Sequence, residues 1–68
     1  MNVSSRKAGT TIKRLREQRA WSQPDLAKAA KLPVRTIGRI ERSEVDVRLG
    51  TLSKIAKALR KRPRDLLP

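Results

Sequence analysis

Arginine and lysine are the side chains of this sequence that are best placed to do chemistry. Eighteen of them face six aspartates and glutamates, which gives a formal charge of +12. Such an excess predicts attraction to a polyanion, with nucleic acid as the first candidate and an anionic membrane surface as its rival. The chain has no histidine and no cysteine, so the usual nucleophile–base pairs and zinc ligands are absent. We therefore expect a binding protein that is not an enzyme and that uses no metal or other cofactor.

Part of this positive charge lies within residues 22–41, which have the pattern of two short helices joined by a tight turn. The first helix begins with Ser22-Gln-Pro-Asp25, which has the form of a capping box, and it runs to about Ala30. Pro24 falls in its first turn, where a missing N–H group costs nothing.

The turn between the two helices is Lys31-Leu32-Pro33, because a proline disfavours helical conformation in the residue before it. A second helix then covers about residues 34–42, with Ile37 and Ile40 on its inner face. The residues left for its outer face are Val34, Arg35, Thr36, Arg39 and Arg42, and three of these are arginines.

The residues on either side predict supporting helices. One begins with Thr10 or Thr11 as its N-cap and ends near Ala20. Another covers residues 49–59, and its apolar face consists of Leu49, Leu52, Ile55, Ala56 and Leu59. Pro63 fits the first position of a short helix over residues 63–67. We expect an all-α, compact bundle of four to five short helices, as a single domain over residues 10–68. Residues 1–9 show no periodicity and are expected to form a flexible basic arm that carries Arg6 and Lys7.

Trp21 is the only aromatic residue of the chain. Modules that bind single strands or RNA stack bases on several aromatic rings, so the composition argues against them. We expect Trp21 to pack against Leu26 as a hydrophobic staple. No apolar run approaches the roughly 18 residues of a membrane span, and the lack of cysteine fits a reducing compartment. These observations favour a cytoplasmic protein.

A longer pattern runs through most of the chain, from about residue 11 to residue 67, without gaps. It consists of Leu15-Arg16, Ser22-Gln23, Leu26-Ala27, Leu32, Thr36-Ile37, Arg39-Ile40-Glu41, Thr51-Leu52 and Ile55-Ala56-Lys57-Ala58-Leu59. In these pieces the sequence resembles the phage-repressor and Cro type of helix-turn-helix protein, often called the Xre family. The resemblance implies a helix-turn-helix formed by the second and third helices. It also implies binding of double-stranded operator DNA by a homodimer, on inverted half-sites about one helical turn apart.

The resemblance further implies that the helix over residues 34–42 lies in the major groove and contacts bases through Val34, Arg35, Thr36 and Arg39. An arginine can donate twice to guanine, and a valine can contact a thymine methyl, so we expect both bases in a half-site. The implied phosphate contacts are Gln23 at a helix start, Arg42, and Arg48 with the backbone near Gly50; Arg6 and Lys7 of the arm are further candidates. Gly38 would allow close approach either of the DNA backbone or of a packed neighbour.

Arg16 and Glu41 match an ion pair of the family, and we expect this pair to fix the angle of the recognition helix rather than to contact bases. Three other positions depart from the family pattern. Lys31 replaces a glycine in the turn, with an expected strain of about 1–2 kcal/mol if it is left-handed. Pro33 replaces a serine or threonine cap, a loss of about 1 kcal/mol. Ser43 replaces a glycine that often ends the recognition helix.

These features favour a prokaryotic or phage transcriptional regulator, most simply a repressor. One alternative is the antitoxin of a toxin–antitoxin pair, which would bind a protein toxin with the same fold. Another is a non-specific, nucleoid-type DNA-binding protein that is attracted by charge alone.

The roles of three features of the sequence stay open. A dimer interface could involve Leu66 and Leu67 or the loop residues Val45 and Val47, and Glu44 and Asp46 could face a partner subunit or nearby arginines. The basic run Arg60–Arg64 could extend the phosphate contacts, bind RNA, act as a nuclear localisation signal, or be a solvated loop at a dimer edge.

Overall fold

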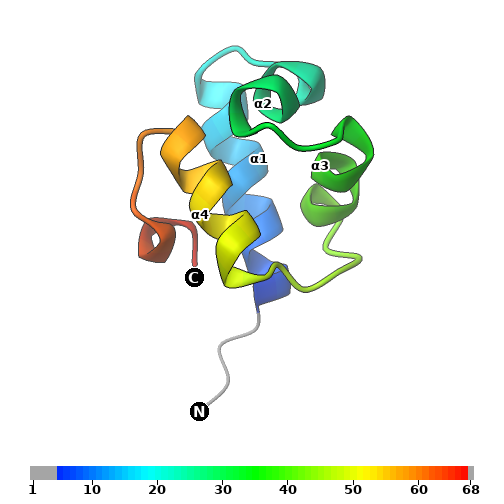
Figure 1. Cartoon of the computed structure of the whole chain (residues 1–68), viewed down its shortest axis with the longest axis vertical. Coiled ribbons are helices and arrows are strands. Elements are labelled where there is room, and N and C mark those ends of the chain that lie inside the picture. The colour runs from blue at the N-terminus through cyan, green and yellow to red at the C-terminus, as the bar shows by residue number, and fades with distance from the viewer. Residues whose placement is uncertain (1–4, 68) are drawn as a thin grey trace.

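The computed structural model describes residues 5–67, and within that range the only regular structure is helical (Figure 1). The helices are η1 (Ser5–Lys7), α1 (Ala8–Gln18), α2 (Gln23–Ala30), α3 (Val34–Glu41), α4 (Leu49–Ala58) and η2 (Pro63–Leu66), of which η1 and η2 are short 3-10 helices. In Figure 1, α4 crosses in front of α1, α2 lies above both, α3 lies on the right and η2 on the left. The predicted all-α bundle is confirmed.

A single apolar core joins these helices. Its largest fully buried side chains come from every α helix and from both sides of the last loop: Ile12, Leu26, Ile37, Ile40, Ile55, Leu59 and Leu66. Each such side chain contributes roughly 1.5–3 kcal/mol on burial. Half-buried side chains, including Leu15, Trp21 and Leu32, pack around this core. The inward positions predicted for Ile37 and Ile40 are confirmed.

The start of α1 differs from the prediction. The helix begins at Ala8 after η1, so neither Thr10 nor Thr11 is its N-cap, and the flanking Lys7 makes no side-chain cap hydrogen bond. The reason is tertiary packing: Ala8 is fully buried, and a Cβ added to Gly9 would lie 2.0 Å from the carbonyl oxygen of Ile40. Burial of this end against α3 therefore overrides the capping preference.

The expectation of a flexible arm over residues 1–9 is therefore wrong for residues 5–9, which are helical. Their first turn is also tied to the loop after α3, because Ser43 Oγ donates to the Arg6 carbonyl oxygen over 3.0 Å and Arg6 Nε lies 3.6 Å from Asp46 Oδ1. Residues 1–4 lie outside the described residues.

All four α helices end in the same backbone motif. After each one, a residue adopts a left-handed conformation: Ala20, Lys31, Ser43 and Arg60, with φ between 55° and 58°. The next N–H group donates back to a carbonyl five residues earlier, as in Trp21 to Arg16 over 3.1 Å and Leu32 to Ala27 over 2.9 Å. This is the Schellman arrangement, in which glycine is the usual left-handed residue because it has no Cβ. None of the four positions is a glycine.

The boundaries of the later helices follow the predictions closely, with one change at α4. The capping box at Ser22 is present, and α3 ends at Glu41 with Arg42 as its C-cap. Leu49 begins α4 but is 73% exposed, so it does not belong to the apolar face on which the prediction placed it. The core contacts of α4 come instead from Leu52, Ile55 and Ala56.

Two of the four apolar residues suggested for a dimer interface are used by the fold itself. Leu66 is fully buried and Val47 is 7% exposed. Val45 and Leu67 are half-buried and pack against the core. The buried pair is therefore unavailable to a partner, because the small domain needs every apolar side chain it can bury.

Candidate nucleic-acid interface

The turn between α2 and α3 has the geometry expected from its residues. Lys31 ends α2 in the left-handed region, with φ 58° and ψ 45°, so the predicted strain at this position is present. Pro33 is the N-cap of α3, is extended, and makes no side-chain cap hydrogen bond. The orphan N–H groups at the start of α3 therefore have no side-chain cap from Pro33, while Thr36 and Ile37 both donate to the Pro33 carbonyl.

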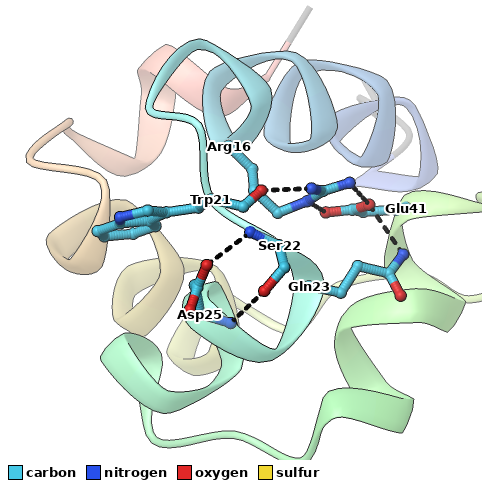
Figure 2. A network of polar contacts seen from close by, with 6 residues as sticks. All are labelled: Arg16, Trp21, Ser22, Gln23, Asp25 and Glu41. Carbon is cyan, nitrogen blue, oxygen red and sulfur yellow. Dashed lines mark hydrogen bonds and ion pairs between the residues drawn. The ribbon is translucent and has the colours of Figure 1, made fainter.

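A buried ion pair connects α1 to the end of α3 (Figure 2). Arg16 donates from Nε to Glu41 Oε2 over 2.7 Å and from Nη2 to Oε1 over 2.9 Å. The two side chains are only 10% and 2% exposed. The hydrogen bond to Glu41 raises the pKa of Arg16 more than burial lowers it, so the arginine stays charged. The predicted pair is present and buried.

The same network continues into the turn before α2. Arg16 Nη1 donates to the Trp21 carbonyl oxygen over 2.6 Å, and Gln23 Nε2 donates to Glu41 Oε1 over 3.1 Å (Figure 2). One ion pair thus fixes the end of α1, the start of α2 and the end of α3 relative to one another. Arginine suits this role because its guanidinium group presents several donors in one plane. Sequence reasoning found the pair but missed Gln23 and the Trp21 carbonyl.

The structure places Gln23 differently from the simple phosphate-contact prediction. Its amide nitrogen is engaged by Glu41, while its Oε1 lies near the position that a Cβ on Gly38 would occupy, at 3.5 Å. The side chain is half-buried at the first turn of α2. Its contact with phosphate remains a prediction, now for a residue that also helps to position α3.

The side chains expected to contact bases lie together on α3. Arg35 and Arg39 are exposed and four residues apart, which places them on one side of the helix. Val34 is 46% exposed and Thr36 is half-buried. Among the described residues neither arginine forms an ion pair, so both guanidinium groups are available to a ligand.

The other candidate phosphate contacts are exposed, but two of them form ion pairs. Arg42 forms an ion pair with Glu44, which lowers the pKa of that carboxyl group through a hydrogen bond. Arg6 pairs with Asp46. Glu44 and Asp46 thus face arginines of the same chain, which is one of the two roles that the sequence left open for them. Lys7, Arg48 and Gly50 are exposed, and nothing lies within 4 Å of a Cβ added to Gly50.

Gly38 is buried between two side chains of this surface. A Cβ there would lie 3.0 Å from Arg42 Nη1 and 3.5 Å from Gln23 Oε1. This geometry favours close approach of packed neighbours as the reason for the glycine. Both neighbours are the ends of flexible side chains, so the site has some freedom to adjust.

Residues 5–67 hold no cluster of three or more potential metal ligands. Within the same residues, no helix is long and apolar enough to cross a membrane.

Comparison with known proteins identifies the fold family. The sequence matches the family model HTH_3, described as helix-turn-helix, over residues 12–66. The chain belongs to the HTH_3 helix-turn-helix family. The match includes α2, α3 and the turn between them, together with Arg16 and Glu41.

A named transcriptional regulator is among the proteins similar to this chain. The chain is 44% identical over 59 residues to the HTH-type transcriptional regulator SutR of Escherichia coli, covering 87% of this chain and 33% of SutR. It therefore spans about a third of the length of this curated relative.

Solved structures share the arrangement of helices. The restriction-modification controller protein C.AhdI from Aeromonas hydrophila is 35% identical, with a TM-score of 0.84, over 88% of this chain and 91% of C.AhdI. The hypothetical transcription factor NHTF from Neisseria is 26% identical, with a TM-score of 0.87, over 94% of this chain and 75% of NHTF.

Proposed function

We propose that this chain is a DNA-binding domain of a transcriptional regulator, and that α3 enters the major groove of a double-stranded operator. One observation carries the proposal: Arg35 and Arg39 are exposed on α3, four residues apart, and neither forms an ion pair with another residue of the described range. In the helix-turn-helix mode of binding, the second helix of the motif presents its side chains to base edges. Membership of the HTH_3 family and the similarity to SutR and C.AhdI support this mode.

We assign base contacts to Val34, Arg35, Thr36 and Arg39, and phosphate contacts to Gln23, Arg42, Arg48, Gly50, Arg6 and Lys7. Arg42 and Arg6 would give up exposed ion pairs, which are worth little in water because solvent and salt screen them. The N–H groups near Gly50 at the start of α4 provide the partial positive charge that attracts phosphate. With these contacts, α3 would determine the sequence specificity of DNA binding, and the surrounding phosphate contacts would add affinity.

We further propose that the regulator is a repressor in the cytoplasm and acts as a homodimer on inverted half-sites. It would not be an enzyme, since the chain has no histidine or cysteine to carry nucleophilic chemistry. Sedimentation with and without operator DNA tests the dimer. A complex containing one chain per operator would contradict it.

Selection of bound sequences from a random duplex pool, repeated at two salt concentrations, tests the central proposal. A common half-site containing G, recovered at both salts, is the expected result. The half-site spacing reports symmetry in the same experiment. Recovery of unrelated sequences at both salts would show that binding depends on charge alone and would refute the assignment to α3.

A further inference from the structure

The C-terminal basic segment, Arg60-Lys61-Arg62-Pro63-Arg64, has no part in the helix-turn-helix surface. All four cations are exposed. Arg62 pairs with Asp65, at 3.5 Å between Nε and Oδ2. In the part of the chain that the structure describes, Arg60, Lys61 and Arg64 form no ion pair. Three positive charges are therefore available within five residues.

The C-terminal basic segment is held in place at both ends. Leu59 before it is 2% exposed and Leu66 after it is fully buried. The Lys61 N–H donates to the Ala56 carbonyl over 2.8 Å, and Asp65 Oδ2 accepts from the Arg62 N–H over 2.9 Å. Asp65, the one acid next to the segment in the sequence, thus caps η2 and pairs with Arg62, and it forms no ion pair with the other three cations. The segment presents its charges from a fixed backbone, so little conformational entropy is lost when they meet a ligand.

The segment lies on the opposite side of the molecule from α3. In Figure 1, α3 is on the right and the loop into η2 is on the left, with α1 and α4 between them. That view is along the shortest axis, so elements separated in the picture are at least as far apart in the molecule. The chain measures 21 Å along the axis that separates them. A duplex seated on α3 would therefore have α1 and α4 between it and this segment.

We propose that the C-terminal basic segment binds the phosphate backbone of a second DNA duplex, so that one molecule bridges two duplex segments. A duplex carries one phosphate charge per roughly 1.7 Å of its axis, which matches a compact group of cations. The segment has no aromatic residue for stacking, which disfavours single strands and RNA loops. It also exposes no large apolar side chain for insertion into a membrane. The proposal rests on the proposed function, because α3 must hold the first duplex.

A capture assay with the full chain tests the bridge. A random-sequence duplex is immobilised on beads, protein is added, and recovery of a fluorescent second duplex of random sequence is measured. The test variant is Arg60→Gln/Lys61→Gln/Arg64→Gln. The matched control is Lys13→Gln/Arg14→Gln/Lys28→Gln, which removes the same charge from exposed positions of α1 and α2. Circular dichroism confirms that both variants are folded.

The expected result is that the test variant loses at least about tenfold in captured duplex, because three phosphate contacts and their released counterions disappear. The control should stay within about twofold of the unmodified chain, because cations that contact no phosphate release no counterions on binding. Both variants bind the immobilised duplex alike. An Arg35→Gln/Arg39→Gln variant loses capture too, because the first duplex is no longer held.

Three outcomes would overturn the proposal. Equal capture by the test and control variants would mean that the segment is a solvated loop. Loss of capture only with the α3 variant would mean that a dimer bridges through its two recognition helices. Binding to phosphatidylserine vesicles that the test variant loses while it still captures duplex would assign the segment to membranes. Since both duplexes are random in sequence, an α3 without base preference would refute the proposed function and leave this measurement intact.

Discussion

Arg16 and Glu41 are the two buried charged residues of the described chain. Removing either of them should affect stability differently from breaking one of the exposed ion pairs. Every donor of the Arg16 guanidinium that faces inward has an acceptor. No buried side-chain N or O atom in the described range lacks a hydrogen-bond partner. A change at either residue would strand a charge in the interior, where water cannot replace the lost partner.

Replacing Glu41 by alanine should destabilise the fold by about 3–5 kcal/mol, the cost of leaving the partner of a buried pair uncompensated. Urea unfolding followed by circular dichroism measures this change. Glu44→Ala serves as the control, since it breaks an exposed pair and should move the urea midpoint little. Similar midpoints for the two variants would show that the buried pair does not hold the bundle.

Arg39 is the residue at which base preference should be most sensitive. Arg39→Ala should lose roughly 1–3 kcal/mol of discrimination at one base position, because a bidentate contact to guanine disappears. Affinity measured against a panel of single-base operator variants reports this loss. Lys13→Ala, which removes an exposed charge from α1, should weaken all operators equally. Uniform weakening by Arg39→Ala would assign that side chain to phosphate.

At the scale of the helices, two buried helical glycines with different neighbours should respond to the same substitution in opposite ways. Gly38→Ala should stabilise by about 1 kcal/mol, the helix propensity difference, since its neighbours are side-chain ends that can move. Gly9→Ala should destabilise by about 1–3 kcal/mol, as overpacking does, because its Cβ would meet the backbone of Ile40. Thermal unfolding of both variants checks the signs. Stabilisation by both would mean that α1 and α3 approach less closely than in the structure, and destabilisation by both would mean that Arg42 and Gln23 do not move aside for a Cβ on Gly38.

The helix ends provide another pair of opposite expectations. Lys31→Gly should stabilise by about 1 kcal/mol, because glycine adopts the left-handed conformation without Cβ strain. Lys28→Gly, three residues earlier inside α2, should destabilise by a similar amount, about 1 kcal/mol. Chemical unfolding of the two variants is the measurement. A destabilising Lys31→Gly would show that the lysine side chain makes a contact that outweighs the strain.

The capping box of α2 should make stability depend on pH in the acid range. Hydrogen bonds from Ser22 lower the pKa of Asp25 below its usual range. A carboxyl group whose pKa is lowered by folding adds stability above its unfolded pKa, and that stability is lost as the pH falls through the folded value. Unfolding midpoints should therefore drop below about pH 4, the ordinary range for aspartate, and Asp25→Asn should show a smaller drop. Equal pH profiles would exclude this contribution.

Sequence patterns predicted the helices where local signals were strong. The capping box at Ser22 and the break at Pro33 are chemical features of a few adjacent residues, and both appear where expected. The start of α1 was missed because it depends on burial of Ala8 and Gly9 against α3, which no local signal encodes. Leu49 was misplaced because helical periodicity does not show whether an apolar residue in the first turn has anything to pack against, and Leu49 is 73% exposed.

At the site, the resemblance identified Arg16 and Glu41 as partners across 25 residues of chain. Periodicity alone would not have joined them. The engagement of Gln23 by Glu41 was missed because a side-chain amide at a helix start fits a phosphate contact equally well. The pairing of Glu44 and Asp46 with arginines depends on the path of the loop after α3, which follows from the left-handed Ser43 and from the docking of η1.

For the whole molecule, salt should affect folding and DNA binding in opposite directions. A charge of +12 on a chain of 68 residues opposes folding by self-repulsion, and added salt screens that repulsion. DNA binding weakens with salt, with a slope of log K against log salt near −0.9 per phosphate contacted. Melting temperatures and operator affinities over one salt series test both trends. A melting temperature that falls with salt would show that the exposed ion pairs outweigh the repulsion.

The four left-handed helix ends bear on how the DNA specificity of such a domain can diverge. Substitutions on α3 that create a new base preference commonly cost stability, and a marginal domain tolerates few of them. Ala20 and Arg60 lie outside α3 and end α1 and α4. A change to glycine at either one can offset such a loss without touching α3. A single substitution to glycine at a helix end can therefore compensate for a destabilising change on α3. The recognition helix can then accept substitutions that favour new operators.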